Sequence, residues 1–418
     1  MIPRFAPRTR LLVVGALVAA TLGLTACSGG GSTGSNADVN TVDAGLANSI
    51  DDAVATAMKQ SGSTEAVVGV WGNDGSEYLR GYGDSGIDGS ARIRGAQATQ
   101  PVMCALVLDL AADGTIKLDG KVSDDLTRQS DIEDVTYRQL CEMRSGIADY
   151  KGAYNDIFAN NPTRPWAEQE LIAQGLSKSP ESWPGLDFHQ SDTNAVLLAR
   201  ALKVKTGEEI PDLLNEHVFS DAKMGSSYFP SMDSTTVSGT TLAGLAYPSS
   251  GGKAVCDAEP MKIAEVSPSM LGGAGATVTT ATDLKNFYDS YLGGTFGGKN
   301  ADVVTKTAPV ANPERDENGE PTSEVSEDGR QWGFGVEKEG PLYGRSGAIT
   351  GTITAAYSDP DSGFSVVVSL NNSSAGAKFA KALAYQLASL AQAQGVAPEL
   401  GWTADDQAAK LAKFAVCQ

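Results

Sequence analysis

The chain has 418 residues, of which 41% are hydrophobic and 20% are charged. This length and composition suit a full hydrophobic core in one large or two ordinary domains, which excludes an intrinsically disordered protein. A formal net charge of −19 argues against nucleic acid as a partner. With only two histidines and no Cys-x-x-Cys motif, a zinc site is not expected, and no cofactor is predicted.

The first residues have the features of an export signal. Arg4, Arg8 and Arg10 precede an apolar run from Leu11 to Leu22 that is too short to span a bilayer, so we expect it to be cleaved. The following Leu24-Thr25-Ala26-Cys27 resembles a bacterial lipobox, in which the cysteine is acylated and becomes the new N-terminus. The alternative is an ordinary signal peptide with a cysteine at its border by chance.

A spacer rich in Gly, Ser and Thr follows, from Ser28 to Ser35, and such a segment is flexible. We therefore expect a signal peptide over residues 1–26, then the lipidated Cys27 and a flexible tether over residues 27–44. The sequence thus predicts a protein attached through a lipid anchor to the outer face of the bacterial cell membrane.

The folded body begins with a helix and a hairpin. Apolar residues at helical spacing predict an amphipathic helix over residues 45–61. The turn Asn73-Asp74-Gly75 between two apolar runs predicts a hairpin with strands at 67–71 and 77–82. The long apolar stretch from Pro101 to Ala112 suits a buried helix that begins at Pro101 or one turn earlier.

Later elements indicate how the chain is organised. We expect helices at residues 137–143, 194–206 and 282–292, strands at 352–357 and 364–370, and an alanine-rich helix at 375–394. Strands near both ends with helices between them predict one α/β (α+β) domain over residues 45–400. In this domain an antiparallel sheet is flanked by helices and carries a helical insert at about residues 110–270. Residues 401–418 are predicted to be a C-terminal tail.

Four segments carry a resemblance to a known family, in the family's order and spacing. Together they are similar to serine β-lactamases of class C, D-alanyl-D-alanine carboxypeptidases and other penicillin-binding-protein-like enzymes, over roughly residues 45–392. The segments are Tyr137–Tyr150, Pro184–Asn194, Ala274–Leu284 and Tyr343–Gly347. The resemblance implies the β-lactamase/transpeptidase-like fold.

Acyl transfer in this family uses a serine and a lysine in a Ser-x-x-Lys motif, where positions i and i+3 share one helix face. A Tyr-x-Asn segment and a basic residue before Thr/Ser-Gly complete the site. In this chain the position of the Ser-x-x-Lys motif is occupied by Gln97-Ala98-Thr99-Gln100, and the position of the Tyr-x-Asn motif by Gln190-Ser191-Asp192. Only the third motif is retained: Arg345 is the basic residue, and Ser346-Gly347 follow it.

A glutamine has no ionisable proton near neutral pH and cannot form an acyl-enzyme. The sequence therefore predicts a pseudoenzyme: a catalytically inactive envelope lipoprotein that binds a cell-wall (peptidoglycan) peptide or an envelope protein. No catalytic residue is assigned. The degenerate motif positions are Gln97, Gln100, Gln190, Asp192 and Arg345, and the expected binding residues are Gln97, Gln190, Asp192, Arg345 and Ser346.

Two alternatives remain open. An active serine-hydrolase-type enzyme (a β-lactamase, D-Ala-D-Ala carboxypeptidase or esterase) would need an atypical site that uses Thr99, Ser191 or Asp192. A structural module would use its outer surface rather than the cleft. Arg345 is expected either to anchor a carboxylate of the ligand or to pair with a local acidic residue.

Four cysteines remain beyond Cys27, and in an oxidising compartment they suggest two disulfides with three possible pairings. The family fold would place the helices that carry Cys104 and Cys141 side by side. The resemblance therefore implies a Cys104–Cys141 bond, and Cys256 would then pair with Cys417.

Overall fold

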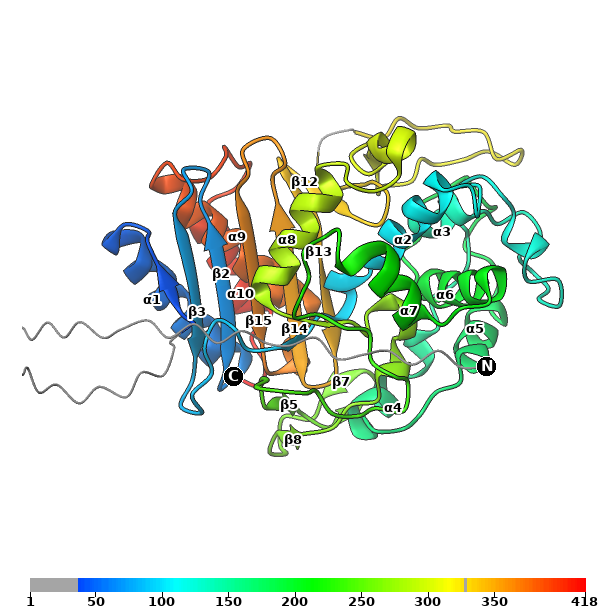
Figure 1. Ribbon diagram of the computed structural model, residues 1–418. Coiled ribbons are helices and arrows are strands. Elements are labelled where there is room, and N and C mark those ends of the chain that lie inside the picture. Colours follow the sequence, from blue (N-terminus) through cyan, green and yellow to red (C-terminus); the bar gives the residue numbers. More distant parts are fainter. Residues whose placement is uncertain (1–36, 327–328) are drawn as a thin grey trace, which may run out of the picture. The chain divides into compact units, whose positions relative to one another are not determined.

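The computed structural model describes residues 37–326 and 329–418, and Figure 1 shows a single large sheet with helices on both of its faces. The sheet has nine strands in the order β1-β3-β2-β15-β14-β13-β12-β11-β10, and every neighbouring pair is antiparallel. Strands from both ends of the chain meet at its centre, where β2 pairs with β15. This confirms the expected fold class.

The strands of the large sheet are β1 (Val39–Asn40), β2 (Ala66–Trp71), β3 (Glu77–Tyr82), β10 (Ala308–Pro309), β11 (Gln331–Trp332), β12 (Glu337–Glu339), β13 (Leu342–Ile349), β14 (Thr352–Ser358) and β15 (Ser365–Leu370). Three two-stranded sheets are formed by β4 (Ile93–Arg94) with β9 (Val278–Thr279), β5 (Gly244–Ala246) with β8 (Met261–Ile263), and β6 (Ser249–Ser250) with β7 (Lys253–Ala254).

The α-helices are α1 (Ala44–Ser61), α2 (Pro101–Ala112), α3 (Tyr137–Cys141), α4 (Asn155–Asn160), α5 (Glu168–Leu176), α6 (Thr193–Thr206), α7 (Ile210–Leu214), α8 (Ala281–Leu292), α9 (Ala377–Ala393) and α10 (Ala404–Lys413). Two short 3-10 helices border the site: η1 (Ala96–Thr99) and η3 (Lys151–Ala153). The helix predicted over residues 137–143 ends earlier, at Cys141, because Met143 adopts a positive φ of 56°.

The sheet separates two hydrophobic cores. On one face α1 and α9 pack against alternate residues of the central strands, among them Val68, Tyr357 and Val366. The opposite face is covered by α8 and by the helices of the insert, with Val67, Ala356 and Val367 pointing into that core. In Figure 1 α8 crosses in front of the sheet and α9 lies behind it. Because both faces are covered, β2, β14 and β15 are buried along their whole length.

Two predicted boundaries are wrong. The tether was expected to reach residue 44, but Val39–Asn40 already pairs with β3, and the Asp38 carboxylate accepts hydrogen bonds from the amides of Gly81 and Gly89. At the other end, residues 401–418 are not a loose tail. Ala404–Lys413 form α10, and Trp402, just before it, stacks its ring on Tyr385 of α9 at 4.4 Å between centroids.

Both expected disulfides are present. Cys104 on α2 is bonded to Cys141 on α3, and Cys256 is bonded to Cys417 near the C-terminus. The first bond lies in the core beside η1, and the second fastens the last residues to the insert. The predicted signal peptide and the lipidation site Cys27 lie outside the described residues. Within the residues described, no helix is both long and apolar enough to cross a membrane.

Candidate functional site

The site is built on a strained turn at the start of α2. Ala96, the first residue of η1, has a φ of +46°, a conformation that L-residues rarely adopt and that is concentrated at functional sites. Gly275 lies directly against it, since a Cβ at Gly275 would stand 2.4 Å from the carbonyl carbon of Ala96. This turn presents Gln97, the position where the family pattern has its serine, toward β13.

Gln97 bridges two parts of the chain with its carboxamide. Its Nε2 donates to Oδ2 of Asp192 at 2.6 Å, while its Oε1 accepts from the backbone N–H of Ala348 at 2.9 Å. The second bond is possible because β12 pairs only with Leu342–Gly344, which leaves the rest of β13 as an uncovered edge. The Gln97 side chain is thus buried, with both ends of its amide satisfied.

Asp192 is the centre of the polar cluster. It stands immediately before α6, and besides Gln97 its carboxylate receives Lys151 Nζ at 2.8 Å and Gln100 Nε2 at 3.3 Å. Arg345 Nη2 lies 3.7 Å from Oδ1 of Asp192, the oxygen that also accepts from Gln100. Asp192 is only 1% exposed, so these groups replace water as its partners.

The charges of the cluster support one another. Burial alone would raise the pKa of the Asp192 carboxyl, but the positive charges of Lys151 and Arg345 outweigh it and hold that pKa below its ordinary value. For Lys151 the two neighbouring carboxylates, Asp192 and Asp149, overcome the effect of burial and raise the pKa of the ammonium group. Burial and the nearby Asp192 raise the pKa of Asp149. Asp192 and Lys151 therefore form an ion pair near neutral pH.

Arg345 is the least satisfied member of the cluster. It is 2% exposed, and no hydrogen-bond partner is found among the described residues for Nε, Nη1 or Nη2. Its guanidinium lies over the ring of Trp332, 4.8 Å from the centroid. A buried guanidinium without hydrogen bonds is costly, and its fork of N–H groups matches a carboxylate.

The structure brings together four of the six residues expected here: Gln97, Gln100, Asp192 and Arg345. Gln190 is not among them, because its side chain is exposed. Ser346 does not belong to the cluster either: side chains alternate along β13, and Ser346 lies opposite Ala355, which packs into the core on the α9 face.

The residue that sequence reasoning missed is Lys151, which enters the cluster from η3, next to the end of the Tyr137–Tyr150 motif. The two tyrosines nearest in sequence to the degenerate Tyr-x-Asn motif do not replace the missing base. Tyr154 donates to Gln174 Oε1 at 3.3 Å, and the Tyr228 hydroxyl accepts from the Ser238 amide at 3.1 Å.

The hydroxyls proposed for an atypical reaction differ in their surroundings. Thr99 donates to the carbonyl of Ala96 at 2.8 Å, so its hydroxyl is engaged within its own turn. Ser191 is buried, and for its hydroxyl no hydrogen-bond partner is found in the described part of the chain. In residues 37–326 and 329–418 there is also no group of three or more His, Cys, Asp or Glu that could hold a metal ion.

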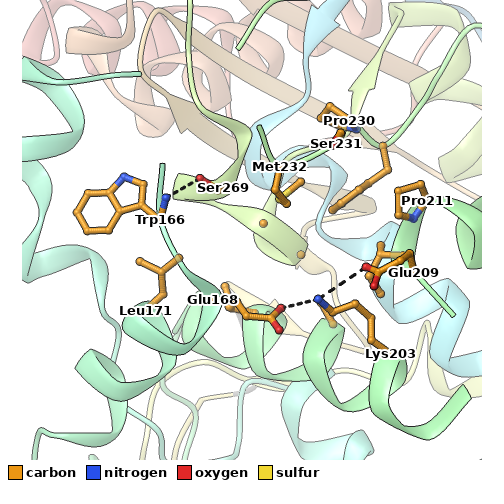
Figure 2. Close-up of a pocket in the computed structure, with 16 residues that line it drawn as sticks. Trp166, Glu168, Leu171, Lys203, Glu209, Pro211, Pro230, Ser231, Met232 and Ser269 are labelled. Atoms are coloured by element: carbon orange, nitrogen blue, oxygen red, sulfur yellow. Dashed lines mark hydrogen bonds and ion pairs between the residues drawn. The ribbon is translucent and has the colours of Figure 1, made fainter. Parts of the chain in front are cut away.

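A separate cavity of about 610 Å³ lies within the insert, between α5, α6 and α7 (Figure 2). Its wall is largely apolar and includes Leu171, Phe229 and Met232. Figure 2 also shows Lys203 between Glu168 and Glu209, at 2.9 and 3.9 Å. None of the Asp192 cluster lines this cavity.

Substitution of Gly347 tests how tightly β13 and η1 are packed. A Cβ at Gly347 would lie 2.1 Å from the backbone nitrogen of Gln97, so we expect Gly347→Ala to destabilise the fold by about 1–3 kcal/mol. Urea unfolding measures the effect, with Gly401→Ala as control, because a Cβ there meets nothing within 4 Å. Equal stabilities of the two variants would mean that β13 and η1 are not in close contact.

Comparison with known proteins agrees with this architecture. The family model described as "Beta-lactamase" matches residues 50–392. A D-aminopeptidase from Cereibacter sphaeroides is 26% identical over 306 residues, which cover 72% of this chain and 54% of the relative. The chain thus spans about half the length of the curated relatives it matches.

Solved structures show the same fold at lower identity. A D-stereospecific amidohydrolase from Streptomyces sp. superposes with a TM-score of 0.67 at 22% identity, covering 80% of this chain and 98% of the other. A D-amino acid amidase from Ochrobactrum anthropi SV3 superposes with a TM-score of 0.62 at 17% identity, covering 78% of this chain and 92% of the amidase. A penicillin-binding protein from Bacillus halodurans superposes with a TM-score of 0.61 at 18% identity, covering 79% of this chain and 97% of the other. The chain therefore belongs to the beta-lactamase family, a family of the serine-hydrolase type.

Proposed function

We propose that this chain is a non-catalytic member of the family, which uses the Asp192 cluster to hold a ligand. The observation that carries the proposal is the position of Gln97: a carboxamide, bonded at both ends to Asp192 and Ala348, occupies the place of the nucleophile. In a serine protease, loss of the nucleophile alone costs a factor on the order of 10⁶ in turnover. Gln100 replaces the lysine as well, so the family reaction lacks its main groups.

The chemistry of the cluster suits recognition of a peptide. The carboxamide of Gln97 illustrates how the site could bind a peptide amide: its oxygen accepts from the backbone of β13, and its nitrogen donates to the Asp192 carboxylate. Arg345 adds a guanidinium for which the described residues provide no hydrogen bond and which would match a carboxylate. Because Gln97, Asp192 and Arg345 are buried, a ligand would reach them by displacing the Gln97 side chain. A fragment of a cell-wall peptide carries both amides and carboxylates and fits this requirement.

The location proposed for the protein is the outer face of the bacterial cell membrane, with Cys27 as the lipidated residue. This rests on the sequence of residues 1–35 alone. Mass analysis of the N-terminal peptide would test it, and an unmodified Cys27 would contradict it.

Covalent labelling tests the absence of catalysis. We expect a fluorescent penicillin to leave no label on the full chain, and intact-mass analysis to detect no adduct, since no serine in the cluster is activated. The matched control is a penicillin-binding protein of the same fold treated in parallel. A stoichiometric acyl adduct on this chain would overturn the proposal.

A second candidate function is hydrolysis by an atypical route, and the comparisons favour it over a purely binding role. The related proteins are named D-aminopeptidase and D-amino acid amidase. Within the structure, the supporting observation is Ser191, whose buried hydroxyl lies next to Asp192 without a hydrogen-bond partner in the described residues. Release of D-phenylalanine from its amide, or turnover of nitrocefin, that disappears in Ser191→Ala would establish this function in place of the first.

A further inference from the structure

Trp183 is the most exposed large hydrophobic side chain of the described residues. It is 80% exposed, against 52% for Val204 and 40% for Ile157. An indole in this position gains nothing from the hydrophobic core, and exposed aromatic side chains are frequent anchors of interfaces. Its position therefore calls for an explanation outside the folding of the domain.

The backbone around Trp183 is fixed by hydrogen bonds. Glu181 N donates to Gly146 O at 2.9 Å, Gly185 N to Arg144 O at 2.7 Å, and Leu186 N to the carbonyl of Trp183 at 3.1 Å. The loop also lies against Gly146 so closely that a Cβ there would stand 2.0 Å from Ser182 O. The indole is thus presented by an ordered segment, which reduces the entropy lost when a partner binds.

Two hollows meet at Trp183. One, of about 550 Å³, has an apolar floor that includes Ile132 and Leu176. The other, of about 510 Å³, lies between Trp183 and the loop that carries Glu317 and Glu320. In Figure 1 this loop projects beyond α2 and α3.

The loop is held in place by Arg315, which forms an ion pair with Asp187 at 2.7 Å and donates to Gly319 O at 2.8 Å. Both walls of the surface are therefore ordered. We call Trp183 with these two hollows the Trp183 surface.

Carboxylates dominate both sides of the Trp183 surface. They are Asp131, Glu133 and Asp134 on one side and Glu317 and Glu320 on the other. Three cations lie beside them: Lys121, which pairs with Asp134 at 2.9 Å, Lys178, which donates to the carbonyl of Asp149, and Arg315, whose charge is matched by Asp187. The surface thus combines an aromatic anchor with excess negative charge, which complements a cationic polypeptide.

We propose that the Trp183 surface binds a basic polypeptide segment of another protein. The aliphatic stem or guanidinium of an arginine or lysine packs on the indole, and the charged groups of its neighbours face the carboxylates on either side. The inference does not depend on the Asp192 cluster and goes beyond the function proposed above. It gives the chain a protein partner as well as a ligand.

The test uses the full chain and a fluorescent nonapeptide of alternating Arg and Gly, with binding followed by anisotropy at low and high salt. We expect binding that weakens as salt is raised, because exposed charges are screened. Trp183→Ala should weaken it roughly tenfold or more. Charge reversal in Glu317→Lys with Glu320→Lys should weaken it and also flatten its salt dependence.

Matched controls lie elsewhere on the surface: Val204→Ala removes an exposed apolar side chain and Glu216→Lys reverses an exposed charge. Both should bind the peptide as the unsubstituted chain does. Absence of binding at low salt, or equal affinity of Trp183→Ala, would overturn the proposal. So would binding of chitotetraose that requires Trp183 while the peptide does not, since that result would identify a sugar site.

Discussion

Replacing Asp192 with alanine should destabilise the fold by about 3–5 kcal/mol, because one partner of a buried ion pair is lost while the others remain. Lys151 and Arg345 would keep their charges without the carboxylate that balances them, and the amides of Gln97 and Gln100 would lose their acceptor. Urea unfolding of the full chain measures the difference. Asp134→Ala is the control, since its pair with Lys121 is exposed and should leave stability unchanged.

The pH dependence of Asp192→Asn provides a second readout. The pKa of Asp192 is lowered in the folded state, so its stabilising contribution is complete above the unfolded pKa of about 3.9. The advantage of the unsubstituted chain over Asp192→Asn should be present at neutral pH and shrink as pH falls below that value. An advantage that is the same at pH 3 and pH 7 would mean that the carboxylate is not held by its charged neighbours.

Removing the Cys256–Cys417 disulfide should lower the free energy of unfolding by about 5 kcal/mol. The bond closes a loop with a sequence separation of 161 residues, and the entropy that such a crosslink removes from the unfolded chain increases with loop length. Urea unfolding under non-reducing conditions measures this difference between the unsubstituted chain and the double variant Cys256→Ser with Cys417→Ser.

The other disulfide is the natural comparison for this experiment. Cys104–Cys141 closes a loop with a separation of 37 residues, so chain entropy predicts a smaller loss, about 4 kcal/mol. A loss below about 1 kcal/mol for the Cys256–Cys417 pair would show that residues near the C-terminus stay ordered around α9 in the unfolded ensemble.

Local patterns were enough to predict most of the fold. The hairpin of β2 and β3 followed from Asn73-Asp74-Gly75, because Gly75 takes the positive φ of 83° that the turn needs. The order of the family motifs placed Gln97 and Arg345 at one site, and both disulfides followed from the same resemblance. Only the hairpin has its physical cause within one short segment; the site and the disulfides were predicted from the resemblance to the family.

The errors arise where the answer depends on distant parts of the chain. Ser346 was assigned to the site because it follows Arg345, but its direction depends on the register of β13 against β14. Lys151 was missed because its partner, Asp192, lies far along the chain. The helix α10 could have been found, since Thr403 and Asp406 form a capping box ahead of an amphipathic stretch.

The last residues of the chain lie against the end of the first helix. The Val416 amide donates to the Gln60 carbonyl, and the Gln418 side chain donates to the Lys59 carbonyl. In Figure 1 this end of the domain is opposite the helices of the insert. Because Cys417 in the same short segment is bonded to Cys256, the last residues of the chain fasten the end of α1 to the insert.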